Sequence, residues 1–301
     1  MMAKGIGRYM RLARPFTLVA PAVGMLSAGI AGLGAAQAQA VSAAAALRLL
    51  LGAILGMALN AASNALNQIT DLAIDRINKP NRPLCRGELS VRAAGWFSAT
   101  AFALALGLAA ALGLAVLAVV AAAAFAVVAY SMPPMRTKRF PFLSNLTIAL
   151  ARGLLLPVAG WAVVQRIDRL EPWYLGGITF LFLAGAASTK DFKDVAGDRA
   201  EGCITLPVKY GARRAAQIIA PFLVLPFALF IVGVRTDLLT AGRPAILMIA
   251  GAVLMPWGAY VAYLMLRRPD DLGRLENHPS WLHMYLMMLG SQAAVIAAYW
   301  P

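Results

Sequence analysis

Long apolar stretches alternate along the chain with short segments that gather charged and turn-forming residues. A helix crosses a bilayer with about 20 predominantly apolar residues, and we expect spans at 15–36, 49–70, 93–112, 114–133, 140–164, 172–189, 215–234, 244–266 and 279–300. The uncharged run after residue 93 is long enough for two spans, which turn around Leu112-Gly113. The pattern predicts an all-α, polytopic membrane protein with nine transmembrane helices in one domain, residues 1–301.

The overall composition agrees with a membrane protein. Hydrophobic residues make up 61% of the chain and charged residues 13%, whereas soluble domains carry about 25% charged residues. The mean hydropathy is +0.72. Because no long polar segment remains outside the nine stretches, a separate soluble domain or linker is not expected.

Basic residues are sorted between alternate loops, which predicts the orientation in the membrane. The N-terminal segment and the loops after spans two, four, six and eight hold 21 of the 27 Lys and Arg residues, the other loops hold five, and Arg152 lies within span five. We therefore expect the N-terminus in the cytoplasm and the C-terminus outside a prokaryotic cell membrane. The net charge of +14 follows from this sorting, so the lipid bilayer is an expected partner, whereas nucleic acid and an obligate protein partner are not.

The first apolar stretch also resembles a cleavable signal peptide, because it ends in Ala36-Gln-Ala38-Gln-Ala40 after a basic start. The stretch is nevertheless long enough to span the bilayer, and the charge pattern requires a helix there. We therefore expect it to remain as the first span.

Two acidic motifs follow spans two and six, on the same predicted side of the membrane. The spacing is i, i+4, i+8 in the first motif and i, i+3, i+7 in the second, which places each set along one face of a helix. Carboxylates at a membrane edge are costly unless they serve a function, so we expect the two sets to face one another across a site on the cytoplasmic side. The six residues are Asn67, Asp71 and Asp75, then Asp191, Asp194 and Asp198.

The five carboxylates of these motifs require cations, and the donor type indicates which cation. Oxygen ligands without histidine or thiolate suit Mg²⁺, which keeps several waters and takes further ligands from a phosphate-bearing substrate. We expect all six residues to hold Mg²⁺ and, through it, a diphosphate. The expected catalytic residues are Asp71, Asp75, Asp194 and Asp198.

Basic loop residues offer charge-assisted donors to the same diphosphate. Lys79 and Arg82 follow the first motif, Lys138 lies between spans four and five, and Lys209 follows the second motif. Each of them is also explained as a positive-inside loop residue. The sequence leaves both interpretations open.

Polar residues within the spans indicate a cavity inside the bundle. Arg152 is a lone guanidinium in an apolar stretch, where a charge normally faces a cavity or an anion. Asn145 precedes it by seven residues, so a regular helix places both on one face. Asn64 either faces the cavity or hydrogen-bonds a neighbouring helix, and Tyr130 is a candidate to shield a carbocation.

At these residues the chain resembles the UbiA family of intramembrane prenyltransferases, and the resemblance covers essentially the whole chain. Its acidic motifs and the residues that flank them are similar to the two motifs of the family. The matching segments are Arg14-Pro15, Asn67-x₃-Asp71-x₃-Asp75, Lys79-Pro80-x-Arg82-Pro83, Tyr130-Ser131-Met-Pro133-Pro134-x-Arg136-x-Lys138, Lys190-Asp191, and Asp194-x₃-Asp198-Arg199.

This resemblance implies a nine-helix bundle with a central cavity open to the cytoplasm and to lipid. It also implies Mg²⁺-dependent transfer of a prenyl chain from an allylic prenyl diphosphate, by ionisation of the diphosphate and attack of an acceptor on the allylic cation. Lys190 and Arg199 would join the diphosphate site, and Arg14 would line the cavity. The segment from Phe140 to Gly153 is most similar to homogentisate-type members, so a lipophilic aromatic acceptor, a phenolic quinone precursor, is expected.

Other acceptors and other functions remain open. Members that prenylate geranylgeranylglyceryl phosphate or chlorophyllide share much of the same sequence, and a terpene cyclase of this fold would use the cation without an acceptor. A CDP-alcohol phosphotransferase is disfavoured because its Asp-Gly-x₂-Ala-Arg core is absent from the chain. A cation transporter is disfavoured because its site would lie near the bilayer midplane, whereas these aspartates lie at helix ends.

Overall fold

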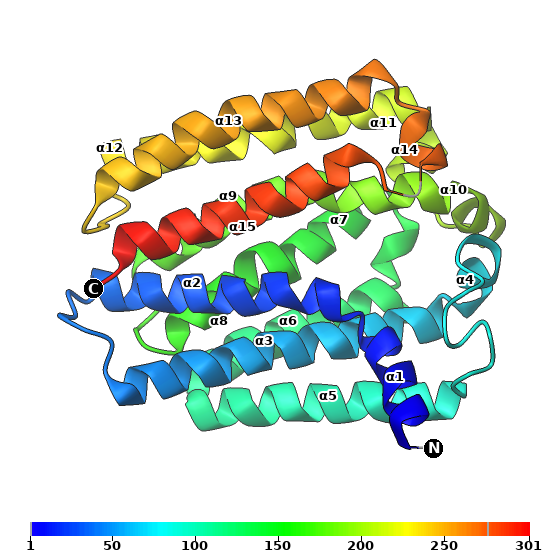
Figure 1. Cartoon of the computed structure of the whole chain (residues 1–301), viewed down its shortest axis with the longest axis horizontal. Coiled ribbons are helices and arrows are strands. Elements are labelled where there is room, and N and C mark those ends of the chain that lie inside the picture. The colour runs from blue at the N-terminus through cyan, green and yellow to red at the C-terminus, as the bar shows by residue number, and fades with distance from the viewer. Residues whose placement is uncertain (1, 276) are drawn as a thin grey trace.

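The computed structural model describes residues 2–275 and 277–301, and all regular elements within these ranges are helices (Figure 1). The predicted all-α class is confirmed. The α-helices are α1 (Met2–Ala13), α2 (Val19–Ala35), α3 (Ala43–Thr70), α4 (Leu72–Asn78), α5 (Val91–Leu112), α6 (Leu114–Ser131), α7 (Leu143–Ile148), α8 (Leu156–Ala162), α9 (Leu170–Ala186), α10 (Asp191–Ala200), α11 (Leu206–Val224), α12 (Ala228–Arg235), α13 (Pro244–Arg267), α14 (Asp271–Arg274) and α15 (Pro279–Tyr299). The shorter elements are the 3₁₀-helices η1 (Pro15–Leu18), η2 (Thr137–Arg139), η4 (Ala187–Lys190) and η5 (Leu225–Phe227), and the π-helix η3 (Ala149–Leu155).

The long helical segments run along the longest axis of the molecule (Figure 1) and match the predicted spans. Within the described ranges, eight segments are long and apolar enough to cross a membrane. The remaining predicted span, 172–189, corresponds to α9, which has 17 residues and continues directly into η4. The two chain ends lie at opposite ends of the bundle (Figure 1), as an odd number of crossings requires.

Two predicted spans differ from a single regular helix. The fifth span consists of α7, the π-helix η3 and α8 in succession. The seventh begins at Leu206 and contains Gly211 with a φ of 75°, and it is interrupted by η5 around Pro226. Proline lacks a backbone N–H and its ring displaces the preceding carbonyl, so an interruption at this residue is expected.

Glycines allow the fifth span to approach its neighbours closely. A Cβ atom on Gly153 would lie 2.6 Å from the Cα of Phe180 in α9, and one on Gly160 would lie 2.6 Å from the carbonyl oxygen of Met25 in α2. Small residues at helix contacts are typical of membrane bundles, where close backbone packing replaces the hydrophobic effect. These contacts fix η3 and α8 against α9 and α2.

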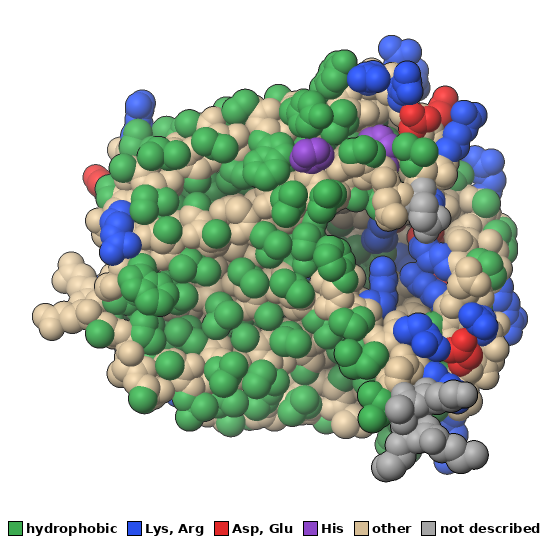
Figure 2. Space-filling model, in the orientation of Figure 1, with side chains coloured by type: hydrophobic (Ala, Val, Ile, Leu, Met, Phe, Trp, Pro, Cys, Tyr) green, Lys and Arg blue, Asp and Glu red, His purple; other side chains and the backbone are tan. Residues whose placement is uncertain are grey.

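The surface separates an apolar body from a charged end. Figure 2 shows hydrophobic side chains over most of the visible face, while Lys, Arg, Asp and Glu gather at the end that carries α4, α10 and α14. A hollow opens in this face near the first turn of α2, with basic side chains inside it (Figure 2). The distribution is that of an integral membrane protein.

Candidate active site

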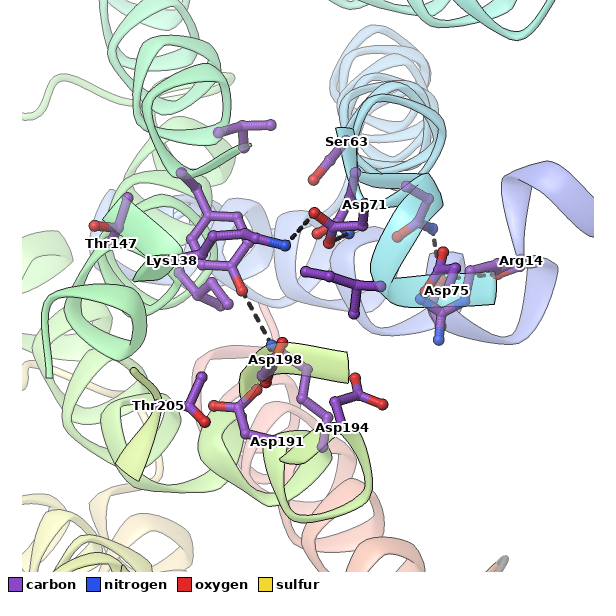
Figure 3. A pocket seen from close by; sticks show the side chains of 18 of the residues that line it. Arg14, Ser63, Asp71, Asp75, Lys138, Thr147, Asp191, Asp194, Asp198 and Thr205 are labelled. Atoms are coloured by element: carbon purple, nitrogen blue, oxygen red, sulfur yellow. Dashed lines mark hydrogen bonds and ion pairs between the residues drawn. The ribbon is translucent and has the colours of Figure 1, made fainter. Parts of the chain in front are cut away.

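A polar cavity of about 190 Å³ lies between the two acidic motifs (Figure 3). Figure 1 shows the helices that carry these motifs, α4 and α10, at one end of the bundle. Its walls come from η1, α3, α4, α6, η2, α7, η3, η4 and α10. Most of the sequence-predicted site residues meet there. Those that line the cavity are Arg14, Asn64, Asn67, Asp71, Asp75, Lys79, Arg82, Tyr130, Lys138, Arg152, Lys190, Asp191, Asp194 and Asp198.

The first acidic motif spans the junction between α3 and α4. Asp71 lies between these helices, with φ −104° and ψ 15°. Its backbone N–H still donates to the carbonyl of Asn67 at 2.9 Å, and the N–H of Asp75 donates to the carbonyl of Asp71 at 2.8 Å. These bonds carry the helical path across the junction, so both aspartates face the cavity as their spacing predicts.

The second acidic motif lies in α10, and Figure 3 shows its three aspartates opposite Asp71. One side chain from α4 fastens the two motifs together. Asn78 donates from Nδ2 to the carbonyl of Asp194 at 3.0 Å and accepts from the N–H of Gly197 at 3.1 Å. A Cβ at position 197 would lie 2.5 Å from Nδ2 of Asn78, so this bridge requires glycine there.

Four of the five carboxylates are paired with basic side chains. Asp71 contacts Lys138 and lies 3.6 Å from Arg136, while Asp75 contacts Arg82. In the second motif, Asp191 contacts Lys190 at 2.7 Å. Asp194 contacts Lys79 at 2.5 Å, so the loop after the first motif reaches across to the second. In these pairs each carboxylate points toward a Lys or Arg side chain. In this arrangement no three His, Cys, Asp or Glu side chains of the described ranges are grouped closely enough to hold a metal ion.

Two acidic groups nevertheless offer oxygen atoms to a ligand. Asp198 forms no ion pair within the described part of the chain. Burial, followed by the nearby charge of Asp191, raises the pKa of Asp198 to about 7. The Oδ1 atom of Asp194 is buried without a hydrogen-bond partner. Unsatisfied carboxylate oxygens in a buried site fit a hard divalent cation.

The walls between the motifs carry Tyr130 and Arg152. Lys190 donates to the hydroxyl of Tyr130 at 3.0 Å, and its Nζ atom lies 5.6 Å from the centre of the Tyr130 ring. Arg152 projects from η3 and donates to the hydroxyl of Ser63 at 3.3 Å. The predicted lone guanidinium therefore faces the cavity.

Comparison with known proteins identifies the fold and the family. A model of the UbiA prenyltransferase family matches residues 25–297. The chain belongs to the UbiA prenyltransferase family. The predicted family, fold class and enzyme class, a prenyltransferase, are thereby confirmed.

Two curated relatives represent two acceptor classes. The digeranylgeranylglyceryl phosphate synthase of Thermococcus kodakarensis is 32% identical over 213 residues, which cover 70% of this chain and 72% of the relative. The homogentisate phytyltransferase of Synechocystis sp. is 32% identical over 214 residues, covering 68% of this chain and 69% of the relative. The UbiA relatives therefore do not single out the predicted aromatic acceptor.

A solved UbiA homolog shares the fold. The homolog from Archaeoglobus fulgidus aligns with a TM-score of 0.71 at 22% sequence identity, covering 96% of this chain and 99% of that one. A structure of that homolog bound to GPP and Mg²⁺ aligns with a TM-score of 0.68 at 21% identity, with the same coverage. The helical arrangement is thus that of the UbiA fold over nearly the full length.

Three predicted site residues do not line the cavity. Asn145 instead donates to the hydroxyl of Ser188, because the π-helix η3 adds residues to the turn and rotates Asn145 away from the face of Arg152. Arg199 is exposed at the end of α10, about 100° around the helix from Asp198. Lys209 is exposed and lies over the ring of Tyr210 at 5.1 Å.

Asn64 both faces the cavity and hydrogen-bonds neighbouring elements, which were its two predicted roles. It lines the cavity, but its Nδ2 donates to the carbonyl of Ala13 at 2.8 Å and to the hydroxyl of Thr17 at 2.8 Å. Its amide therefore fastens α3 to the end of α1 and to η1.

The sequence did not single out Asn78 or Thr205 as site residues. Asn78 follows Asp75 by one turn, on the helix that presents the first motif, which is the only local signal for its role. Thr205 lines the cavity, and its hydroxyl is buried without a hydrogen-bond partner. Only the folded chain brings these two side chains to the site.

Proposed function

We propose that this UbiA prenyltransferase transfers a prenyl chain from an allylic prenyl diphosphate to an acceptor in a reaction that requires Mg²⁺. The observation that carries the proposal is the pair of acidic motifs facing one another across a cavity, each with basic partners from a loop. The Archaeoglobus fulgidus homolog bound to GPP and Mg²⁺ supports it by analogy of fold. The positive-inside pattern supports a cytoplasmic active site, with the N-terminus inside and the C-terminus outside the membrane.

The donor set fits Mg²⁺, and six residues would hold it: Asn67, Asp71, Asp75, Asp191, Asp194 and Asp198. The chemistry that bound Mg²⁺ supplies is neutralisation of charge on the departing diphosphate. The basic residues that now pair with the carboxylates would then be released to donate hydrogen bonds to diphosphate oxygens. They are Lys79, Arg82, Lys138 and Lys190.

These donors favour cleavage because they meet charge that develops in the transition state. The bond between the allylic carbon and oxygen breaks, and its electron pair leaves with the diphosphate. Tyr130 presents its ring to the same cavity, where an aromatic face stabilises a cation. The acceptor then forms a bond to the allylic carbon and loses its proton to solvent.

For the acceptor we propose a glycerol-based phosphate such as geranylgeranylglyceryl phosphate, in place of the predicted aromatic compound. The 32% identity to the Thermococcus kodakarensis synthase over 70% of this chain favours it. An aromatic acceptor is the second candidate, favoured by the similarity to the homogentisate phytyltransferase of Synechocystis sp..

The test uses purified protein, radiolabelled geranylgeranyl diphosphate and Mg²⁺, with geranylgeranylglyceryl phosphate, homogentisate or no acceptor. The proposal expects a prenylated product that depends on the glyceryl phosphate and disappears when a chelator removes Mg²⁺. A cyclic product in the reaction without acceptor would indicate a terpene cyclase. Full activity in chelator would overturn the metal assignment, and absence of transfer to either acceptor would overturn the proposed function.

A further inference from the structure

Two basic residues of the cavity wall stand apart from the others. Six Lys and Arg side chains line the cavity, and four of them pair with an aspartate of the acidic motifs. Within residues 2–275 and 277–301, no carboxylate lies within ion-pair distance of Arg14 or Arg152. The cavity therefore has two basic side chains that no aspartate of the acidic motifs pairs with, although Arg14 lies beside Asp75 (Figure 3).

The backbone at Arg14 is held in an unusual conformation by α3. Arg14 has a φ of 59°, which is uncommon for a residue other than glycine and persists only when its surroundings fix it. Three amides of α3, spaced four residues apart, donate to the carbonyls on either side of Arg14. Asn60 donates to Thr17 at 3.0 Å, Asn64 to Ala13 at 2.8 Å and Gln68 to Leu12 at 2.9 Å.

Arg152 also lines the cavity and is held by close helix packing. It projects from the π-helix η3, which Gly153 allows to pack directly against Phe180. It donates to the hydroxyl of Ser63 at 3.3 Å, and a hydroxyl leaves the charge uncompensated. Arg152 also lines a small apolar pocket that adjoins the cavity, together with Gly56, Leu59 and Leu156. A guanidinium at this depth is stabilised by an anion.

The charges of these two residues act on one another. Desolvation in the cavity, followed by repulsion from Arg82 and Arg152, lowers the pKa of Arg14 to about 10, although the side chain keeps contact with solvent. Asp75 and Asp194 act in the opposite sense, but those carboxylates already contact Arg82 and Lys79. An anion between Arg14 and Arg152 would relieve this repulsion.

We propose that Arg14 and Arg152 bind the acidic group of the acceptor, a phosphate or a carboxylate, while the acidic motifs bind the prenyl diphosphate. This inference rests on the proposed function, because it divides one cavity between the two substrates. Guanidinium groups bind phosphate and carboxylate through paired hydrogen bonds, which fix the orientation of the bound group. Bound in this way by the two arginines, the acceptor would have its nucleophile oriented toward the allylic carbon.

The experiment measures binding rather than turnover. The protein is saturated with Mg²⁺ and an unreactive prenyl thiodiphosphate, and then titrated with two matched pairs of probes. One pair is geranylgeranylglyceryl phosphate and its dephosphorylated alcohol, and the other is homogentisate and its methyl ester. The ratio of the dissociation constants within each pair reports recognition of the acidic group and shows whether it is a phosphate or a carboxylate.

The wild type should bind the acidic member of one pair at least about tenfold more tightly, since a charge-assisted contact of this kind is typically worth that much. Arg14→Gln and Arg152→Gln should each remove most of this preference and leave the affinity for the thiodiphosphate within about threefold. Unchanged thiodiphosphate binding also shows that the variants are folded. Arg213→Gln is the matched control, because Arg213 is exposed on α11 and does not line the cavity.

Three results would overturn the inference. The wild type would show no preference for an acidic probe in either pair, or the preference would survive in both variants, or the variants would lose thiodiphosphate affinity instead. The last result would assign both arginines to the diphosphate site. Failure of the proposed function is measured separately, as an absence of prenyl transfer by the wild type, and does not affect the binding ratios.

Discussion

Buried charges lie at both ends of the bundle, but their partners differ in kind. At the end away from the cavity, the buried Glu171 accepts hydrogen bonds from the N–H of Thr240 at 2.7 Å, from its hydroxyl at 3.0 Å, and from the hydroxyl of Tyr299. Arg48 donates to the carbonyls of Val163 at 2.6 Å and Leu112 at 2.7 Å. Both charged groups are satisfied by neutral partners within the protein.

At the cavity end, charged groups contact other charged groups, and the network is not closed. Four aspartates pair with flexible Lys or Arg side chains, while Asp198, Arg14 and Arg152 have no ion pair among the described residues. Fully satisfied polar networks stabilise a fold, whereas partly satisfied ones are costly unless a ligand completes them. The comparison therefore assigns the hydrogen bonds of Glu171 and Arg48 to stability and the charged groups of the cavity to binding. Substitutions at each end of the bundle can separate the two roles.

The largest effect is expected at the acidic motifs. Asp71→Asn or Asp194→Asn removes one hard ligand and one charge with little change of shape, so kcat/KM for prenyl transfer should fall by about 10²-fold or more. The melting temperature is measured in parallel, because the substitution also leaves Lys138 or Lys79 without its carboxylate partner. Asp270→Asn, at an exposed position before α14, is the control. Near wild-type kcat/KM in both variants would remove the acidic motifs from catalysis.

A substitution at Glu171 should lower stability and leave activity unchanged, which is the reverse of the effect expected at the acidic motifs. Glu171→Ala leaves the donors of Thr240 and Tyr299 without an acceptor, at a cost of about 2 kcal/mol in the free energy of unfolding. Thermal unfolding in detergent measures this loss, and the specific activity of the folded fraction should stay unchanged. Asp168→Ala is the matched control, because Asp168 is exposed and pairs with Arg166 only at the surface, where an ion pair is worth about 1 kcal/mol or less. Equal stability of the two variants would contradict the structural role of Glu171.

A smaller effect is expected from Asn78, which lies on α4 with the first acidic motif and hydrogen-bonds the backbone of the second. Asn78→Ala removes the two hydrogen bonds that join α4 to α10, so the motifs should lose their alignment and kcat/KM should fall about tenfold. The Mg²⁺ concentration for half-maximal activity should rise, which loss of stability alone would not cause. Asn277→Ala, at an exposed position, is the control. A variant with less folded protein but normal Mg²⁺ dependence would show that Asn78 acts only on stability.

The residues show which parts of the fold and site the sequence can predict. The spans follow from apolar length, and the acidic motifs follow from spacing within one helix, since both are local properties. Asn145 was misplaced because a π-helix changes the register without a sequence signal that a regular period would reveal. The bridge from Asn78 to Gly197 and the contact between Lys79 and Asp194 join residues more than 100 positions apart, so they depend on how the helices pack.

The smallest effects are expected at the two predicted diphosphate ligands that lie outside the cavity. Arg199 and Lys209 are exposed to solvent, where their charges are screened over about 10 Å, so Arg199→Gln and Lys209→Gln should each change kcat/KM by less than about threefold. Lys138→Gln serves as the positive control, because this buried lysine contacts Asp71 directly. It also removes one positive charge, but we expect this variant to lose far more activity than the other two. Kinetic measurements on the three variants at low and high ionic strength separate direct contact from screened attraction, since only the latter fades with salt. A loss of tenfold or more in Arg199→Gln or Lys209→Gln would mean that the loops close over the bound diphosphate and bring these side chains into the site.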